Sequence, residues 1–135
     1  MTQPAFTWPA RVYWEDTDAG GVVFYANYLK FFERARTEWL RAAGGEQQRL
    51  RLEAGLIFVV SETVVRYLAP ARLDDELTIT VEPVELGRAT LTVHQRALRG
   101  DQVLAESSIR VGCVNAHDFK PARIPASLLA ALQRP

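Results

Sequence analysis

Acidic residues, two glycines and an aromatic run lie together in residues 15–28, EDTDAGGVVFYANY. Asp16 and Asp18 alternate along the chain, so in an extended segment their carboxylates would point the same way. Gly20 and Gly21 permit positive φ and a close approach of the backbone to a ligand. A carboxylate beside free N–H groups at a helix start can do carbonyl chemistry. The N–H groups polarise the carbonyl oxygen, while the carboxylate attacks the carbon or deprotonates a water that does.

A structural explanation of the same residues remains open. Acidic side chains are common near helix starts, because the partial positive charge there favours them. Carboxylates in loops also accept hydrogen bonds from turn amides, and glycines often only shape a bend. The residues after the glycines would form apolar walls before a helix begins: Val22, Val23, Phe24 and Tyr25. Residue types alone make this segment a candidate site without deciding that it is catalytic.

The composition limits the class of protein. A chain of 135 residues that is 48% hydrophobic and 24% charged is typical of one soluble globular domain, here residues 1–135. The formal net charge of +0 gives no basic field that would favour nucleic acid or an anionic membrane. One cysteine, Cys113, forms no internal disulfide, and two distant histidines, His94 and His117, do not suggest zinc. We therefore expect no metal, no organic cofactor and no nucleic-acid partner.

The chain also gives an expectation for location. Its N-terminus lacks the basic start and apolar block of a secretory signal. No apolar run approaches the roughly 18 to 20 residues needed to span a bilayer. We expect a cytoplasmic protein without membrane insertion.

One long amphipathic helix is predicted over residues 27–43, directly after the acidic segment. Apolar residues recur there at spacings of four and three, on one face of a helix: Tyr28, Phe32, Ala35, Trp39 and Ala43. Asn27 is expected to be the N-cap, and Gly44 and Gly45 would end the helix.

The remaining elements are mostly strands, with a short polar helix predicted at 46–54. A first strand is expected over 6–14, and four further runs show a period of two: 57–68, 75–86, 88–98 and 102–114. A short helix would start near Pro125. Short turns join antiparallel neighbours, and the apolar helix face needs a sheet to cover it. This predicts an α+β fold, a curved antiparallel sheet of five or six strands wrapped around one central helix. Its exposed edges favour at least a homodimer.

Residues 13–41, YWEDTDAGGVVFYANYLKFFERARTEWLR, resemble the signature of the hot-dog-fold acyl-CoA thioesterases. The YbgC-like and hydroxybenzoyl-CoA thioesterases are the most similar groups. The family pattern is matched by Asp18, Gly21, Val22, Val23, Asn27 and Tyr28. The stretches YLAPARLDDELTI at 67–79 and KPARIP at 120–125 are similar as well. The resemblance implies a hot-dog fold and hydrolysis of an acyl-CoA, with a short aliphatic or aromatic acyl group.

The resemblance also assigns roles to residues. Asp18 matches the catalytic carboxylate, which attacks the thioester carbonyl or activates water. The backbone N–H of Tyr25 matches the group that polarises the thioester oxygen, and Gly21 matches the glycine that lets the substrate approach. Further residues are expected to bind substrate: Val22, Val23, Asn27, Ser61 and Thr63, with Lys120 and Arg123 as candidates for the phosphates of CoA. For Asn27, Ser61 and Thr63, capping, packing or ordinary strand polarity explains the residue equally well.

Other candidates receive structural roles. Asp16 is expected to be a turn or supporting residue, Glu33 a surface or interface ion-pairing group, and Cys113 an inert core residue. His94 is expected on the outer face of the sheet, with no role.

One departure from the family concerns position 25. Many YbgC-like members carry a histidine there, and this chain carries Tyr25, which leaves the acyl preference open. A non-catalytic module that binds acyl-CoA or acyl-carrier protein, or a scaffold for a partner, is an alternative, although it would not need Asp18. A hot-dog dehydratase would call for a catalytic histidine, and none lies in the motif. For the enzyme, we expect a homodimer with substrate at its interface, and further pairing into a homotetramer.

Overall fold

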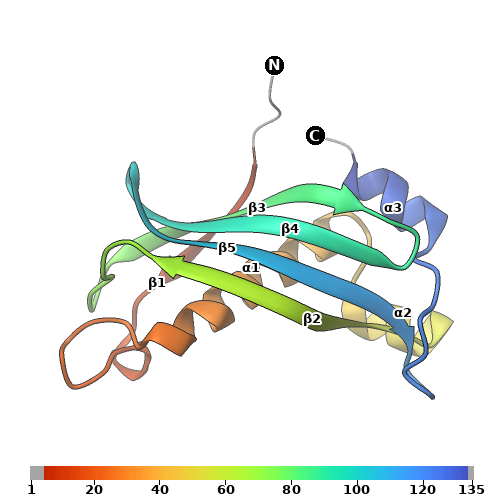
Figure 1. Ribbon diagram of the computed structural model, residues 1–135, viewed down its shortest axis with the longest axis horizontal. Helices are drawn as coiled ribbons and strands as arrows, with labels where there is room; N and C mark the ends of the chain where they lie inside the picture. Colours follow the sequence, from red (N-terminus) through yellow and green to blue (C-terminus); the bar gives the residue numbers. More distant parts are fainter. Residues whose placement is uncertain (1–4, 134–135) are drawn as a thin grey trace.

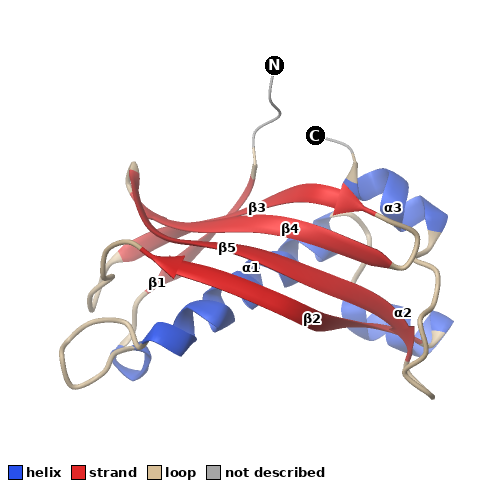
Figure 2. Ribbon diagram, in the orientation of Figure 1, coloured by secondary structure: helices blue, strands red, loops and turns tan. Residues whose placement is uncertain are grey.

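The structure, a computed structural model, describes residues 5–133 and contains one antiparallel sheet with a long helix across one face (Figure 1). The strands are β1 (Phe6–Arg11), β2 (Leu56–Tyr67), β3 (Glu76–Leu86), β4 (Thr90–Arg99) and β5 (Gln102–Asn115). The helices are α1 (Tyr28–Ala42), α2 (Gln47–Ala54) and α3 (Ala126–Leu132), with single 3₁₀ turns at Trp14–Asp16 and Tyr25–Asn27. All three helices lie on one side of the sheet, and its other face carries none of them (Figure 2).

The order of the strands across the sheet is β1-β3-β4-β5-β2, and every pair is antiparallel. Short turns join β3, β4 and β5 as consecutive neighbours, as predicted. β2 pairs with β5 instead of β3, so residues 68–75, which we call the 68–75 connection, lead from one edge of the sheet across to β3. β1 and β2 are the two edge strands.

The core lies between α1 and the sheet. Phe31, Phe32 and Ala35 of α1 are at most 1% exposed, and they face the buried residues of β3, β4 and β5. The predicted strand faces are confirmed for β4, where Leu91, Val93, Gln95 and Ala97 are buried and the residues between them are partly exposed. The architecture expected from the sequence, an antiparallel sheet of five or six strands around one long helix, is therefore confirmed, with five strands among the described residues.

One predicted element boundary near the N-terminus is wrong. The first strand ends at Arg11 instead of residue 14, because Trp14–Asp16 form a 3₁₀ turn stabilised by the bond from the N–H of Asp16 to the carbonyl of Tyr13 (3.0 Å). Asn27 occupies the N-cap position of α1 as predicted, but its side chain forms no capping hydrogen bond. The other predicted helices agree with α2 and α3 to within two residues at each end.

A polar contact is buried under α1. Gln95 is 0% exposed, and its Nε2 donates to the carbonyl of Phe32 at 2.9 Å. Its Oε1 accepts from Nη1 of Arg36 at 3.0 Å. Burial lowers the pKa of the Arg36 guanidinium, and the nearby charge of Glu33 partly opposes this. Gln95 therefore supplies a needed acceptor to a partly desolvated cation.

Among residues 5–133, no helix has the length and apolar character to cross a membrane.

Replacing Gln95 with Leu keeps the side-chain volume but removes the acceptor for Arg36. We expect Gln95→Leu to lower the free energy of unfolding by about 1–3 kcal/mol, since a buried donor is left without its partner. Urea denaturation at fixed protein concentration measures this. The double variant Arg36→Met/Gln95→Leu removes both polar groups and should regain part of the loss. The explanation would be contradicted if the double variant lost as much unfolding free energy as Gln95→Leu and Arg36→Met lose together when measured singly.

Candidate functional site

The two aspartates that were predicted to point the same way have different surroundings. Asp16 is 4% exposed, and its carboxylate accepts from the N–H of Tyr13 (2.8 Å) and from Nδ2 of Asn27 (2.9 Å). Asp18 lies on the surface. The predicted common orientation is wrong, because Asp16 ends a 3₁₀ turn and the segment is not extended there. Asp16 has the supporting role that was expected for it.

Asp16 ties the acidic segment to the start of α1. Its side chain holds the amide of Asn27, the last residue before the helix, and its carbonyl accepts from the N–H of Phe24 at 2.9 Å. Asn27 stands at the N-cap position without a capping bond, and its Nδ2 donates to Asp16 instead. Asn27 is 6% exposed, so within one chain its side chain supports the fold, and its expected contact with substrate stays a prediction.

Asp18 is part of a tight loop, residues 17–23, which we call the acidic loop. The loop closes through a bond from the Asp18 N–H to the Val22 carbonyl (2.9 Å) and one from the Gly21 N–H to the Asp18 carbonyl (3.0 Å). Oδ1 of Asp18 accepts from the N–H of Gly20 at 2.8 Å. Oδ2 accepts no hydrogen bond from the described part of the chain. One oxygen of an oriented carboxylate is thus free to react.

The glycine at position 21 is required by the backbone. Gly21 has φ of +78°, where other residues are strained, and nothing lies within 4 Å of the position a Cβ would take. The open space in front of Gly21 agrees with its expected role in substrate approach. Val22 is partly exposed beside it, whereas Val23 is 5% exposed and belongs to the core. Within one chain the Val23 side chain therefore has a core role, and its expected contact with substrate stays a prediction.

The start of the helix presents a free backbone donor. Tyr25 opens the 3₁₀ turn that leads into α1, and its N–H donates to no acceptor within residues 5–133. Its carbonyl accepts from the hydroxyl of Tyr67 at 2.7 Å, while its side chain is 65% exposed. Unpaired N–H groups at a helix start carry partial positive charge and can polarise a carbonyl oxygen.

The 68–75 connection holds the acidic loop against the helix start. The N–H of Val23 donates to the carbonyl of Ala71 at 2.9 Å, and the N–H of Ala71 donates to the Tyr28 hydroxyl at 3.1 Å. Val22 also forms a bridge with Arg72. Burial raises the pKa of Tyr28, partly opposed by the bond from Ala71 and by the charge of Arg99, so its hydroxyl stays neutral. None of these contacts is predicted by the sequence, although residues 67–79 resemble the family.

The other predicted binding residues lie on segments outside the acidic loop and the start of α1. Ser61 lies at an irregularity in β2, where its hydroxyl donates to the Arg110 carbonyl at 3.3 Å. Thr63 is opposite buried Ile109, so it lies on the helix side of this edge strand and is exposed. Lys120 and Arg123 are exposed, and neither forms an ion pair within the described part of the chain.

The basic pair is far from Asp18 within one chain. The N–H of Ala116 donates to the Gly55 carbonyl, and that of Asn115 to the Lys120 carbonyl, so this turn lies at the Leu56 end of β2. The acidic loop lies near the other end, where Tyr67 contacts Tyr25. At roughly 3.3 Å per residue, the two ends of β2 are about 36 Å apart.

Two cavities lie elsewhere in the structure. One, of about 310 Å³, lies between β1 and α1 and is lined by Trp8, Arg11, Asp16 and Arg34 among others. The other, of about 60 Å³, lies between α1 and β2 and is lined by Glu33, Arg36, Phe58 and Val60 among others. Asp18 lines neither. Within residues 5–133, no group of three or more His, Cys, Asp or Glu side chains could hold a metal.

Comparison with known proteins places this geometry in a family. The profile of the Thioesterase-like superfamily matches residues 12–132. The chain belongs to this superfamily. It is 44% identical over 131 residues to the acyl-CoA thioesterase YbgC of Haemophilus influenzae, covering 97% of this chain and 96% of that protein. It is also 44% identical over 135 residues to the acyl-CoA thioester hydrolase YbgC of Escherichia coli, covering 99% and 100%.

Solved structures agree with the family. A probable thioesterase from Bartonella henselae is 35% identical, with a TM-score of 0.85, covering 90% of this chain and all (100%) of that one. The predicted family, the hot-dog fold and the class of enzyme, a thioester hydrolase, are therefore confirmed.

The contribution of Asp16 can be measured without an assay of activity. We expect Asp16→Ala to lower the free energy of unfolding by about 2–3 kcal/mol, because it leaves the buried amide of Asn27 without its charged acceptor. Chemical denaturation measures the change. Glu15→Ala is the matched control, since Glu15 is an exposed neighbour in the same turn. Equal stability of the two variants would show that the Asp16–Asn27 contact contributes nothing.

Proposed function

We propose that this thioesterase hydrolyses acyl-CoA thioesters to a free acid and CoA, with Asp18 as the catalytic carboxylate. The observation that carries the proposal is the pairing of a free Asp18 Oδ2 with the free N–H of Tyr25, on segments tied together through Asp16 and Ala71. The two YbgC relatives, an acyl-CoA thioesterase and an acyl-CoA thioester hydrolase, support the substrate class. Short aliphatic and aromatic acyl groups remain the proposed range.

The chemistry follows from these two groups. The Tyr25 N–H would stabilise the negative charge that develops on the thioester oxygen. Asp18 then acts in one of two ways. It attacks the carbonyl carbon, the C–S bond breaks, CoA leaves as a thiolate that takes a proton, and water cleaves the resulting anhydride. Alternatively, it takes a proton from a water that attacks the same carbon, after which the C–S bond breaks and CoA leaves as a thiolate that takes the proton.

The first test removes the charge of Asp18. We expect Asp18→Asn to lower kcat at least about hundredfold, because an amide neither attacks the carbonyl nor accepts the proton of water efficiently. Release of free thiol from a panel of acyl-CoAs measures this. Asp101→Asn, in the exposed β4–β5 turn, is the control and should keep the wild-type rate. Wild-type turnover by Asp18→Asn would refute the assignment.

We also propose that the enzyme is a homodimer paired along β2. This edge strand exposes apolar side chains, with Val60 50%, Val64 55% and Tyr67 47% exposed. An unpaired edge with such residues favours addition of another strand. Antiparallel pairing of two β2 strands about a two-fold axis would place the Leu56 end of one chain beside the Tyr67 end of the other.

The homodimer would complete the site. In that arrangement the partner's Lys120 and Arg123 approach the acidic loop of this chain, where they could bind CoA phosphates. The proposed channel for the pantetheine arm then lies between subunits. Exposed aromatic side chains on the β1 side, among them Trp8 and Trp14, support further pairing into a homotetramer.

One continuous core supports a single domain over residues 1–135. We also propose a cytoplasmic location, with no membrane insertion, no nucleic-acid partner and no cofactor.

A shared site predicts complementation between two inactive forms. Asp18→Asn and Lys120→Ala/Arg123→Ala proteins are each purified, then mixed with partial denaturation and refolding. We expect about a quarter of wild-type activity at low substrate concentration, because half of the dimers are mixed and each mixed dimer has one intact site. Refolding each variant alone is the control. Activity no higher than the average of the two controls would contradict a site built from two chains.

A further inference from the structure

The 68–75 connection contacts the chain on both sides of the acidic loop. Before the loop, the N–H of Val12 donates to the carbonyl of Asp75 (2.9 Å), and the N–H of Asp74 donates to the carbonyl of Val12 (3.0 Å). At the last residue of the loop and beyond it, Ala71 bonds with Val23 and with Tyr28. The position of the acidic loop therefore depends on the position of this connection.

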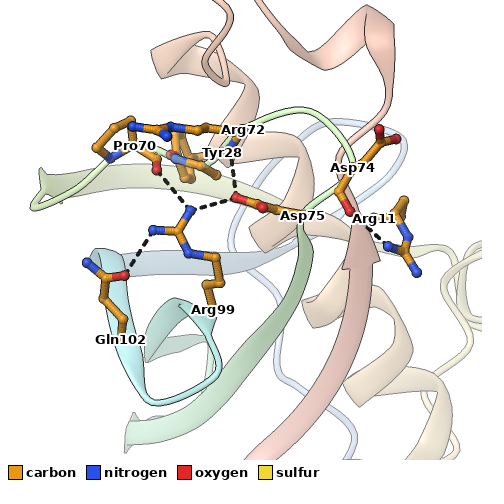
Figure 3. Close-up of polar contacts among 9 residues, drawn as sticks. Arg11, Tyr28, Pro70, Arg72, Asp74, Asp75, Arg99 and Gln102 are labelled. Carbon is orange, nitrogen blue, oxygen red and sulfur yellow. Dashed lines mark hydrogen bonds and ion pairs between the residues drawn. The ribbon is translucent and has the colours of Figure 1, made fainter.

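Arg99, at the end of β4, fixes the connection from the side of the sheet (Figure 3). Its Nη1 donates to Oδ2 of Asp75 at 2.7 Å and to the carbonyl of Pro70 at 3.4 Å. Its Nη2 donates to Oε1 of Gln102, just beyond the β4–β5 turn, at 2.9 Å. One guanidinium thus joins the β4–β5 hairpin to both ends of residues 70–75.

The carboxylate of Asp75 is well suited to this contact. It also accepts from the N–H of Arg72 at 2.9 Å. Partial burial raises the pKa of Asp75, but the bond from Arg72 and the bond and charge of Arg99 outweigh this, so its pKa lies below the usual value. The ion pair is partly shielded, with side chains 35% and 22% exposed. A short, partly shielded pair of this kind is stronger than an exposed one.

The connection needs such support because it contains a strained residue. Asp74 has φ of +71°, a left-handed conformation that non-glycine residues adopt at a cost. Its carbonyl accepts from Nη1 of Arg11 at 2.8 Å, which holds it from the β1 side. A strained loop keeps its shape only where surrounding contacts determine it, and Arg99 supplies the contact on the opposite side.

We propose that Arg99 is a positioning residue for thioester hydrolysis, acting through Asp75 and residues 70–75 to hold the acidic loop against the start of α1. This inference rests on the proposed function. Arg99 bonds to Asp75, Pro70 and Gln102 and to neither Asp18 nor Tyr25, so its effect is indirect. Displacement of a catalytic group by about 1 Å can cost about hundredfold in rate, so a small shift of the connection is sufficient to affect catalysis.

The test compares Arg99→Met with Arg99→Lys, at a temperature where circular dichroism shows each variant folded. We expect Arg99→Met to lower kcat by about tenfold to hundredfold, with KM changed by less than about twofold, because substrate contacts remain while the carboxylate is displaced. Arg99→Lys keeps the ion pair with Asp75 but cannot bond to Gln102 at the same time. Its kcat should lie between those of Arg99→Met and wild type.

Arg41→Met is the matched control. Arg41 forms ion pairs with Glu38 and Glu46, both at 3.3 Å, at the C-terminal end of α1, and among the described residues it has no contact with the 68–75 connection. Its kcat should equal that of wild type. Asp75→Asn should reproduce the effect of Arg99→Met. The double variant Asp75→Asn/Arg99→Met should be no slower than the slower single variant, since both changes break the same contact between Arg99 and Asp75.

The outcomes separate this proposal from the function on which it depends. If wild type releases no thiol from acyl-CoA, the proposed function fails. If wild type is active and Arg99→Met is less stable but has unchanged kcat, the role of Arg99 is structural and the positioning proposal is overturned. If Arg99→Met does not fold, the test uses Arg99→Lys and Asp75→Asn instead. Wild-type kcat in both of these variants overturns the proposal. A lowered kcat at constant KM supports it.

Discussion

The carboxylate of Asp16 lies inside the protein, where an ionised group is stable only if hydrogen-bond donors surround it. It finds two, the N–H of Tyr13 and the side-chain amide of Asn27. Together these bonds fix the end of the 3₁₀ turn and the start of α1 relative to each other. The acidic loop connects these two points, so the place of Asp18 follows from a contact that Asp18 does not make. The geometry of the site is set mainly by buried polar bonds around it.

The same pair of aspartates shows how environment divides the work between two identical side chains. Asp16 is enclosed and has both carboxylate oxygens bonded, which makes it a rigid support. Asp18 is exposed and has one oxygen bonded to the N–H of Gly20, which orients it and leaves the other oxygen available. Satisfied buried groups specify structure, whereas a reactive group needs an unsatisfied atom facing the substrate. Two aspartates only two positions apart can differ in this way because the 3₁₀ turn Trp14–Asp16 ends just before Thr17.

Most of the fold could be predicted from the sequence because apolar periodicity records it directly. The spacing of Phe32, Ala35 and Trp39 predicted α1, and the alternation in β3 and β4 predicted their buried faces. The turn at Trp14–Asp16 has no such period, since it is stabilised by local hydrogen bonds and by the contact of Asp16 with Asn27, eleven residues away. For the same reason the bond between Asn27 and Asp16 and the burial of Val23 were not predicted: a capping residue and a pocket wall look the same in sequence as an internal amide and a core valine.

The candidate site was predictable in its central residues and not in its support. Asp18, Gly21 and Tyr25 were identified from residue types and from the family resemblance, and the structure brings them into one region. Arg99 and Asp75 are 24 positions apart, and a charged pair at that separation has no distinctive pattern in one sequence. Only the path of the 68–75 connection, which follows from β2 pairing with β5, brings them together.

The placement of β2 at the edge also determines how complete the site can be in one chain. Because β2 pairs with β5, the acidic loop lies near one end of β2 and the turn that carries Lys120 lies near the other. A single chain therefore presents Asp18 to solvent, with apolar side chains of Tyr25, Leu29 and Tyr67 exposed nearby. Exposed apolar residues beside Asp18 are unfavourable for an isolated subunit, and if Asp18 is the catalytic carboxylate, water would compete there with the acyl group. A second subunit along β2 would remove both problems at once, since one contact would cover the apolar surface and enclose the thioester.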